Sequence, residues 1–314
     1  MRPETIPAPK SLGEVPLSLR SRPSLQLFVI LAGVLAIAFI VPLRRWLGYA
    51  LQSGSLYSHV LLIPFVSGYL IWIQRASLPQ PRRGSFLFSF PFVLAGTAFL
   101  LVPWIFKLRG SELSLNDFLS ITMASFYSFL VGVAVFALGP SFCRRILFPI
   151  AFLALIIPFP EAFTTALETA LKYASAEIYA VFMNLLGQTY FRQGLVFSLP
   201  NLAIEVAQEC SGVRSSLILF ITSLLAGHMF LAKARNRALL ALLVLPLGAV
   251  RNAFRILVLS LLSTHWDPGI INSPLHHRGG ALFFALSLIP FFMVLIVLFK
   301  REKAGQQALG KSYA

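Results

Sequence analysis

The sequence predicts an all-α protein that crosses a membrane several times as a polytopic helical bundle. Hydrophobic residues make up 57% of the chain and charged residues only 12%, and the mean hydropathy is +0.80. These values exclude an ordinary soluble domain. Apolar runs of spanning length recur along most of the sequence. Such runs must be helices, because each backbone amide in lipid needs a hydrogen-bond partner within its own segment.

We expect about eight spans and three regions. The spans are placed at 25–43, 57–74, 86–105, 117–138, 145–158, 212–232, 237–263 and 279–300. Residues 1–24 are rich in Pro, Ser and Arg and are expected to form a disordered cytoplasmic tail. Residues 25–303 form the predicted transmembrane domain, and residues 304–314 a short cytoplasmic tail.

The net charge of +15 is spread over short loops and the two ends of the chain, which favours contact with membrane lipids over nucleic acid. The residues concerned are Arg20, Arg22, Arg75, Arg82, Arg83, Arg144, Arg145, Lys233, Arg235, Arg237, Lys300, Arg301 and Lys303. The positive-inside rule assigns them, and both termini, to the cytoplasm. Some basic residues fall on the other side of this scheme, among them Arg44, Arg45, Lys107 and Arg109.

Residues 161–186 are apolar enough to be a ninth span, but a ninth span would move the basic cluster at 233–237 outside. Their first half also carries a polar stripe at helical spacing, formed by Glu161, Thr165, Glu168 and Lys172. We therefore predict an interfacial or re-entrant helix on the outer face. The outer loop that follows is expected to hold a short hairpin around 195–199 and 202–206.

Cys210 is the first candidate site residue, because it lies where a polar stretch enters the sixth apolar run. A cysteine at a helix end is ordinarily a small apolar residue, but the flanking Glu209, Ser211, Gly212 and Arg214 favour a reactive thiol. Arg214 is one helical turn away, and the first-turn amides of the helix favour a thiolate. Gly212 permits close backbone approach. The other cysteine is expected on the inner side, in a structural role and with no disulfide to the first.

Arg251 and Arg255 lie four residues apart in the seventh run and therefore share one helix face. A charge near the centre of a span costs roughly 2.5–3.5 kcal/mol, so both are expected to face polar partners or water. Snorkelling to the interface is the alternative for Arg255. Asn252 between them is a further buried polar group that needs a partner.

His276 and His277 fall in the outer loop before the eighth run. The other histidines have no ligand spacing to them, so no metal site and no cofactor is expected. Beside a thiolate, a histidine is a natural proton shuttle. The predicted topology brings Cys210, Arg255 and the histidine pair to the same side of the membrane.

These residues, taken in order, resemble the exosortase/archaeosortase family. The resemblance rests on three blocks: Glu209-Cys210-Ser211-Gly212-Val213-Arg214-Ser215, then Asn252-Ala253-Phe254-Arg255-Ile256 after Pro246, then His276 with Gly280. The segment Tyr57-Ser58-His59-Val60-Leu61-Leu62-Ile63-Pro64-Phe65 is also similar to that family's second span. The resemblance covers roughly residues 50–300.

The resemblance implies a membrane-embedded cysteine protease or transpeptidase of the bacterial inner membrane, with its active site facing the periplasm. Cys210 is then the nucleophile, Arg255 the arginine and His276 the histidine of the site, with His276 preferred over His277 for its spacing to Gly280. The remaining candidates are supporting or substrate-binding, namely Arg214, Arg251, Asn252, Ser211, Gly212, Glu209, His277 and His59.

The implied partner is an exported protein whose C-terminal sorting signal has a short motif, often Pro-Glu-Pro, then a transmembrane helix and a basic tail. The family often accompanies exopolysaccharide production. Two other classes stay open: a non-enzymatic transporter or exopolysaccharide-export subunit, and a membrane glycosyltransferase. A transporter would keep its function without Cys210. A glycosyltransferase is expected to have an acidic outer site, which the scattered glutamates do not form.

Overall fold

The computed structural model describes residues 23–52, 57–200, 202–206, 212–266 and 280–312. Its first half contains α1 (Pro23–Ala38), α2 (Ile40–Leu51), η2 (Ser58–Leu62), α3 (Ile63–Ile73), η3 (Arg75–Ser77), α4 (Phe86–Leu108), α5 (Leu115–Leu138), α6 (Pro140–Arg145), α7 (Leu147–Leu153) and η4 (Ala154–Ile156). Its second half contains α8 (Glu161–Leu185), β1 (Phe191–Gln193), β2 (Val196–Leu199), β3 (Leu202–Glu205), α9 (Val213–Phe230), α10 (Ala234–Leu242), α11 (Val244–His265) and α13 (Gly280–Ser312). The predicted tail at 1–24 falls almost wholly outside the described residues, and α13 continues through much of the predicted tail at 304–314.

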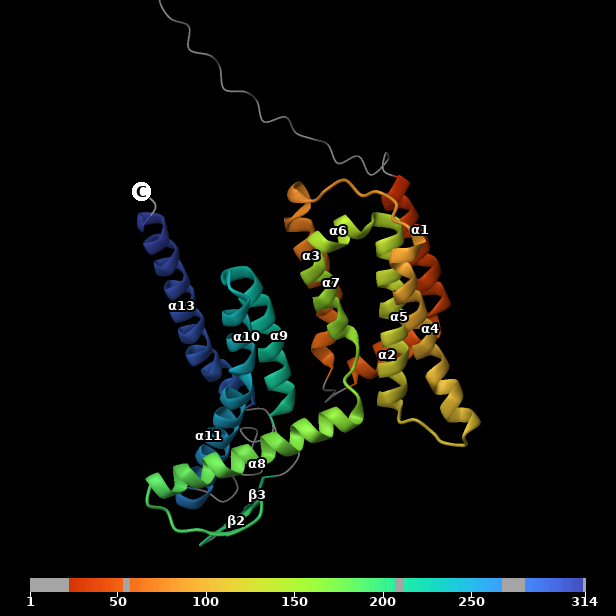
Figure 1. The fold of residues 1–314 in the computed structure, drawn as a ribbon. Helices are drawn as coiled ribbons and strands as arrows, with labels where there is room; N and C mark the ends of the chain where they lie inside the picture. Colours follow the sequence, from red (N-terminus) through yellow and green to blue (C-terminus); the bar gives the residue numbers. More distant parts are fainter. Residues whose placement is uncertain (1–22, 53–56, 201, 207–211, 267–279, 313–314) are drawn as a thin grey trace, which may run out of the picture.

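Most helices stand roughly upright, and α8 runs across one end of the group (Figure 1). The start of α1, the short α6 and the C-terminal end of α13 lie at the opposite end from α8. Strands β2 and β3 lie beyond α8, on the side away from the upright helices. The predicted all-α polytopic architecture is confirmed, with one small sheet added at the α8 end.

The span count differs from the predicted eight. Within the described residues, five helices are long and apolar enough to cross a membrane, and two bent helix pairs raise this number to seven at most. The five are Phe86–Leu108, Leu115–Leu138, Val213–Phe230, Ala234–His265 and Gly280–Gln307. The apolar runs at 25–43, 57–74 and 145–158 do not form single straight helices of spanning length.

Each of these three runs is interrupted for a local reason. α1 and α2 meet at an angle of 74°, and Phe39 at the break is buried with its ring centroid 5.5 Å from that of Phe126. In the second run, Pro64 stands in the first turn of α3, where a missing N–H has no cost, so α3 begins only at Ile63. In the third run, the helix ends before Pro158, and the chain turns by 89° into α8.

α8 matches the helix predicted at 161–186. Its N-terminus is capped from another helix, because the Asp117 carboxylate accepts a hydrogen bond of 2.7 Å from the backbone N–H of Glu161. The second half of α8 packs on α11: Tyr179 and Met183 share a buried cluster with Ala253 and Ile256. The sharp bend and the transverse direction of α8 fit the predicted interfacial or re-entrant placement better than an upright span (Figure 1).

The sheet is antiparallel, in the order β1-β2-β3. The β2–β3 pairing confirms the predicted hairpin, with Phe197 opposite Ile204. Both side chains are buried in the cluster that α8 and α11 share. Arg192 on β1 ties the sheet to α8 through two hydrogen bonds to the Glu177 carboxylate, of 2.6 and 3.1 Å. This pairing lowers the pKa of Glu177 below its usual value.

The other end of the bundle is closed by Glu302 on α13. Its carboxylate accepts hydrogen bonds from the backbone N–H groups of Ala232 and Lys233, at 2.7 and 3.1 Å, and from Nδ2 of Asn236 at 2.7 Å. These donors lie at the turn between α9 and α10. The N–H groups of the turn before α10, and the Asn236 side chain in the first turn of α10, are therefore bound by a residue of α13.

Candidate functional site

Gly212 forms the turn from which α9 begins, two residues after Cys210. Its φ of +67° lies in the left-handed region, which a glycine adopts without steric cost. Its carbonyl oxygen accepts three hydrogen bonds: from the backbone N–H of Ser216 (3.0 Å), from Oγ of Ser215 (2.9 Å) and from Nη2 of Arg251 (3.1 Å). A Cβ at Gly212 would stand 2.9 Å from that Nη2 atom. The position thus requires glycine both for its backbone angle and for the approach of Arg251.

Arg251 is the buried charge of the site, with 8% of its surface exposed. Besides Gly212, its Nη2 atom contacts Oγ of Ser216 at 3.4 Å. Ser216 fits because Gly248 lies opposite, where an added Cβ would stand only 2.5 Å from the Ser216 hydroxyl. Arg251 therefore spans the gap from α11 to the first turn of α9, and it faces polar partners as the sequence predicted.

Asn252 joins the same site to α8. It is 2% exposed, and its Nδ2 donates a hydrogen bond of 3.1 Å to Oγ of Ser175. The Ser175 hydroxyl in turn donates to the carbonyl oxygen of Ala249 at 3.5 Å. Asn252 was expected to need a hydrogen-bond partner, and that partner is Ser175 on α8. Neighbouring residues of α11 hold two different helices, α9 through Arg251 and α8 through Asn252.

Arg255 and Arg214 differ from Arg251 in exposure. Arg255 lies one turn further along α11 and is half-buried, and Arg214 in the first turn of α9 is exposed. The structure therefore places one arginine inside the α9–α11 contact and two nearer its surface. The start of α9 lies at the α8 end of the bundle (Figure 1), and Arg251 contacts it through Gly212.

Several predicted site residues lie outside the described residues, so their mutual geometry is not part of the structure. They are Glu209, Cys210, Ser211, His276 and His277. His59 falls within η2, but its side chain is also outside the described part.

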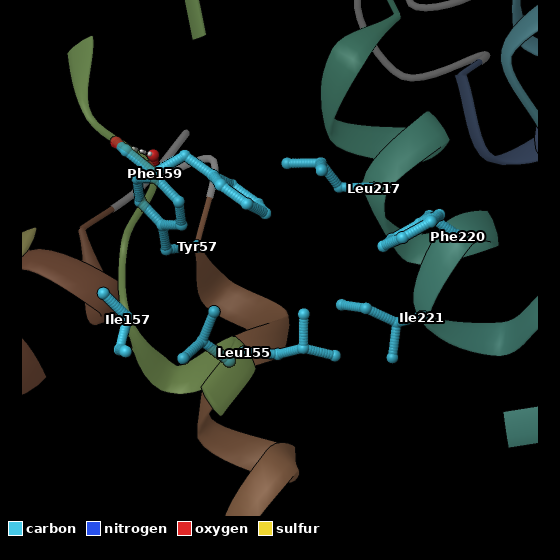
Figure 2. A pocket seen from close by; sticks show the side chains of 8 residues that line it. Tyr57, Leu155, Ile157, Phe159, Leu217, Phe220 and Ile221 are labelled. Carbon is cyan, nitrogen blue, oxygen red and sulfur yellow. Dashed lines mark hydrogen bonds between the residues drawn. The ribbon is translucent and has the colours of Figure 1, made fainter. Parts of the chain in front are cut away.

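The segment that carries His59 nevertheless lies near α9. Tyr57 and Val60, on either side of it, line a small cavity that α9 closes with Leu217, Phe220 and Ile221. Figure 2 shows these α9 side chains facing Tyr57, Leu155 and Ile157 across the space. The Tyr57 hydroxyl donates a hydrogen bond of 3.2 Å to the carbonyl oxygen of Phe159. With a volume near 10 Å³, the cavity has room for about one water, so it is a packing feature rather than a substrate pocket.

Three residues of this site were missing from the sequence analysis: Ser175, Ser216 and Gly248. Each is a small residue within a helix. Small residues at helix contacts let backbones approach closely, and serine hydroxyls bond across helices. Their presence in α8, α9 and α11, beside an arginine and an asparagine that needed partners, was a usable signal.

Three comparisons with known proteins bear on this chain. A family model described as transmembrane exosortase matches residues 46–293, which cover α3 through α11 and the first part of α13. The match includes all the candidate site residues. No curated protein and no solved structure matches the chain.

Proposed function

Because the chain belongs to the transmembrane exosortase family, we propose that it is a membrane-embedded cysteine peptidase or transpeptidase. Its substrates are exported proteins with a C-terminal sorting signal. In this proposal Cys210 is the nucleophile, Arg255 stabilises the oxyanion and His276 transfers the proton. These roles follow from the match of the sequence to the family's residue blocks.

The observation that supports the proposal best is the hydrogen bond from Arg251 to the carbonyl of Gly212, at 3.1 Å. It fixes the turn that follows Cys210 directly against the helix that carries Asn252 and Arg255. A nucleophile needs a rigid position relative to the groups that act with it. Cys210 and Arg255 are 45 residues apart in the sequence, so a tertiary contact such as this one is needed to bring their segments together.

The chemistry follows from these side chains. The Cys210 thiolate attacks the scissile carbonyl carbon, and the electrons of the C=O bond move to its oxygen. The Arg255 guanidinium donates hydrogen bonds to this oxyanion. When the oxyanion collapses, the C–N bond breaks and the departing amine takes a proton from His276, leaving a thioester. Water, or an amine or hydroxyl acceptor, then attacks the thioester and gives a proton to His276, and the C–S bond breaks to release the thiolate.

The orientation is part of the proposal. Arg144 and Arg145 on α6 lie at the end opposite α8 (Figure 1). Under the positive-inside rule that end faces the cytoplasm, so the α8 end, with Gly212 and Arg251, faces the periplasm of a bacterial inner membrane. An exported substrate would meet the site there, and its membrane segment would approach through the lipid.

The direct test replaces Cys210 by Ala and by Ser. The assay follows a reporter protein that ends in a Pro-Glu-Pro motif, a transmembrane helix and a basic tail. We expect both variants to accumulate in the membrane at the parent level and to leave the reporter uncleaved. The matched control is Cys143→Ala, because Cys143 is buried in α6 at the opposite end. Cleavage by Cys210→Ala at the parent rate would contradict the proposal and favour a non-enzymatic membrane protein.

A further inference from the structure

β3 is an edge strand of the sheet at the α8 end. Within the described residues it pairs only with β2, in the order β1-β2-β3. Its four residues, Leu202–Glu205, directly precede the stretch that contains Cys210. An edge strand presents backbone N–H and C=O groups to which another extended chain can pair.

The register shows which groups of β3 face outward. The backbone N–H of Val206 donates to the carbonyl oxygen of Leu195 at 3.0 Å. Because hydrogen-bonded and non-hydrogen-bonded pairs alternate in an antiparallel ladder, Ile204 also bonds towards β2. Ala203 and Glu205 occupy the alternate positions, so their N–H and C=O groups face away from β2. No hydrogen bond within the described part of the chain uses these outward groups, and both residues are exposed.

The buried face of β3 is packed against α11, which fixes the position of the strand. Ile204 and Val206 are 9% and 1% exposed, and they share a buried cluster with Ala253 and Ile256 of α11. A chain added at the edge would therefore be positioned relative to α11, the helix that carries Arg251. A fixed edge also loses little conformational freedom when a peptide binds.

The opposite edge, β1, is less suited to this role. β1 has three residues, and by the same alternation only Arg192 faces outward. The guanidinium of Arg192 bonds to the carbonyl of Gly194 and to Glu177, and it lies over the ring of Phe197 at 5.2 Å. β1 thus offers one outward N–H and one outward C=O, whereas β3 offers two of each.

We infer that the outer edge of β3 binds the substrate polypeptide as an added strand. Two N–H and two C=O groups at a spacing of two residues complement an extended peptide. Glu205 is five residues from Cys210, a separation of at most about 18 Å along the chain. In the sequence, four residues separate the end of β3 from the proposed nucleophile. The inference rests on the proposed function, since it names how that site takes its substrate.

Proline substitution tests the inference at single backbone groups. Ala203→Pro and Glu205→Pro each remove one outward N–H but no hydrogen bond to β2, so the sheet is expected to survive. The reference variants Ala203→Ser and Glu205→Gln keep the N–H. With the Pro-Glu-Pro reporter, we expect each proline variant to cleave about 3- to 10-fold more slowly than its reference, the effect of one hydrogen bond.

The pair Arg192→Pro and Arg192→Ala is the matched control on β1. Both remove the guanidinium, and only the proline removes the outward N–H. We expect these two variants to cleave at equal rates. If Arg192→Pro were slower than Arg192→Ala while the β3 prolines matched their references, the peptide would bind at β1 and the inference would be wrong.

Cross-linking gives a second readout that does not depend on turnover or on the stability of a proline variant. In a Cys143→Ala, Cys210→Ala background, the Glu205→Cys variant is oxidised together with reporters that carry single cysteine substitutions along the motif. We expect cross-links at alternating reporter positions, because an added strand has a period of two. Cross-links only between two enzyme chains, or none to the reporter, would overturn the inference.

Failure of the inference and failure of the proposed function give different results. If Cys210→Ala abolishes cleavage while the β3 prolines match their references, β3 is not the binding edge and the peptidase assignment stands. If Cys210→Ala cleaves normally, the assignment itself fails.

Discussion

The guanidinium of Arg251 and the carbonyl of Gly212 are 3.1 Å apart, and this hydrogen bond joins α11 to the turn that begins α9. The two residues are mutually adapted, because any side chain at Gly212 would meet Nη2 of Arg251. The carbonyl end of that turn is thereby held by a charged donor, which makes a stronger hydrogen bond than a neutral one. The first predictions address this pair.

Gly212→Ala combines two penalties. The left-handed φ alone costs about 1–2 kcal/mol for an alanine, and the close approach to Arg251 adds to it. Gly187→Ala is the matched control, since Gly187 has a φ of +63° but no neighbouring atom within 4 Å of an added Cβ. We expect Gly187→Ala to lower thermal stability modestly with reporter cleavage unchanged, and Gly212→Ala to lose stability further and to lose cleavage. Equal effects of the two would show that contact with Arg251 is unimportant.

Arg251→Lys keeps the charge but loses the planar geometry that reaches Gly212 and Ser216 together. Losing a hydrogen bond from a charged donor costs about 1.5–3 kcal/mol. We expect reporter cleavage to fall about 10- to 100-fold, the corresponding factor for 1.4–2.8 kcal/mol, while the protein stays in the membrane. Arg144→Lys, an exposed substitution at the opposite end, serves as control. Full cleavage by Arg251→Lys would contradict a positioning role for Arg251.

Asn252 and Ser175 are expected to act as one unit. Each single substitution to alanine removes the 3.1 Å hydrogen bond between α11 and α8, so the double variant should be no more than slightly less stable than the worse single one. The expected coupling is about 0.5–1.5 kcal/mol. Thermal unfolding of the parent, the two single variants and the double variant measures it. Strictly additive losses would show that the two side chains do not interact.

Acid should loosen the sheet from α8. Arg192 lowers the pKa of Glu177 relative to the unfolded chain, so the pairing stabilises the folded state at neutral pH and is lost as pH falls through the lowered pKa. The hydrogen-exchange protection factors of β1 and β2, which correct for the intrinsic pH dependence of exchange, should therefore fall in acid. Glu177→Gln should lower this protection at neutral pH and remove its acid dependence. An unchanged acid response in Glu177→Gln would assign the response to another group.

Hydropathy and spacing predicted the helical class, the transverse helix at 161–186 and the hairpin, because each leaves a periodic pattern in the sequence. They did not predict how the three interrupted runs bend. Hydropathy measures only the length of an apolar run. A bend depends on the tertiary packing of side chains such as Phe39 and on prolines such as Pro64 and Pro158. The expectation of about eight spans, one for each apolar run, therefore did not take these bends into account.

For the site, residue chemistry identified Arg251 and Asn252 as buried groups that needed partners. It did not identify the partners, because Ser175 and Ser216 are ordinary residues whose importance comes from contacts over 77 and 35 positions of sequence. A single sequence does not show which residues far apart along the chain come into contact. The predicted meeting of Cys210 with His276 stays a prediction, since both lie outside the described residues.

The contacts of Glu302 have a consequence for how the protein is made. The backbone N–H of Ala232 is paired with an acceptor that is synthesised 70 residues later, after the whole of α11. The turn between α9 and α10, and with it the upright pair that presents Gly212, is thus completed only once residue 302 has been synthesised. Chains that stop before residue 302 should insert into the bilayer and yet remain open at that turn, exposed to the membrane's quality-control proteases.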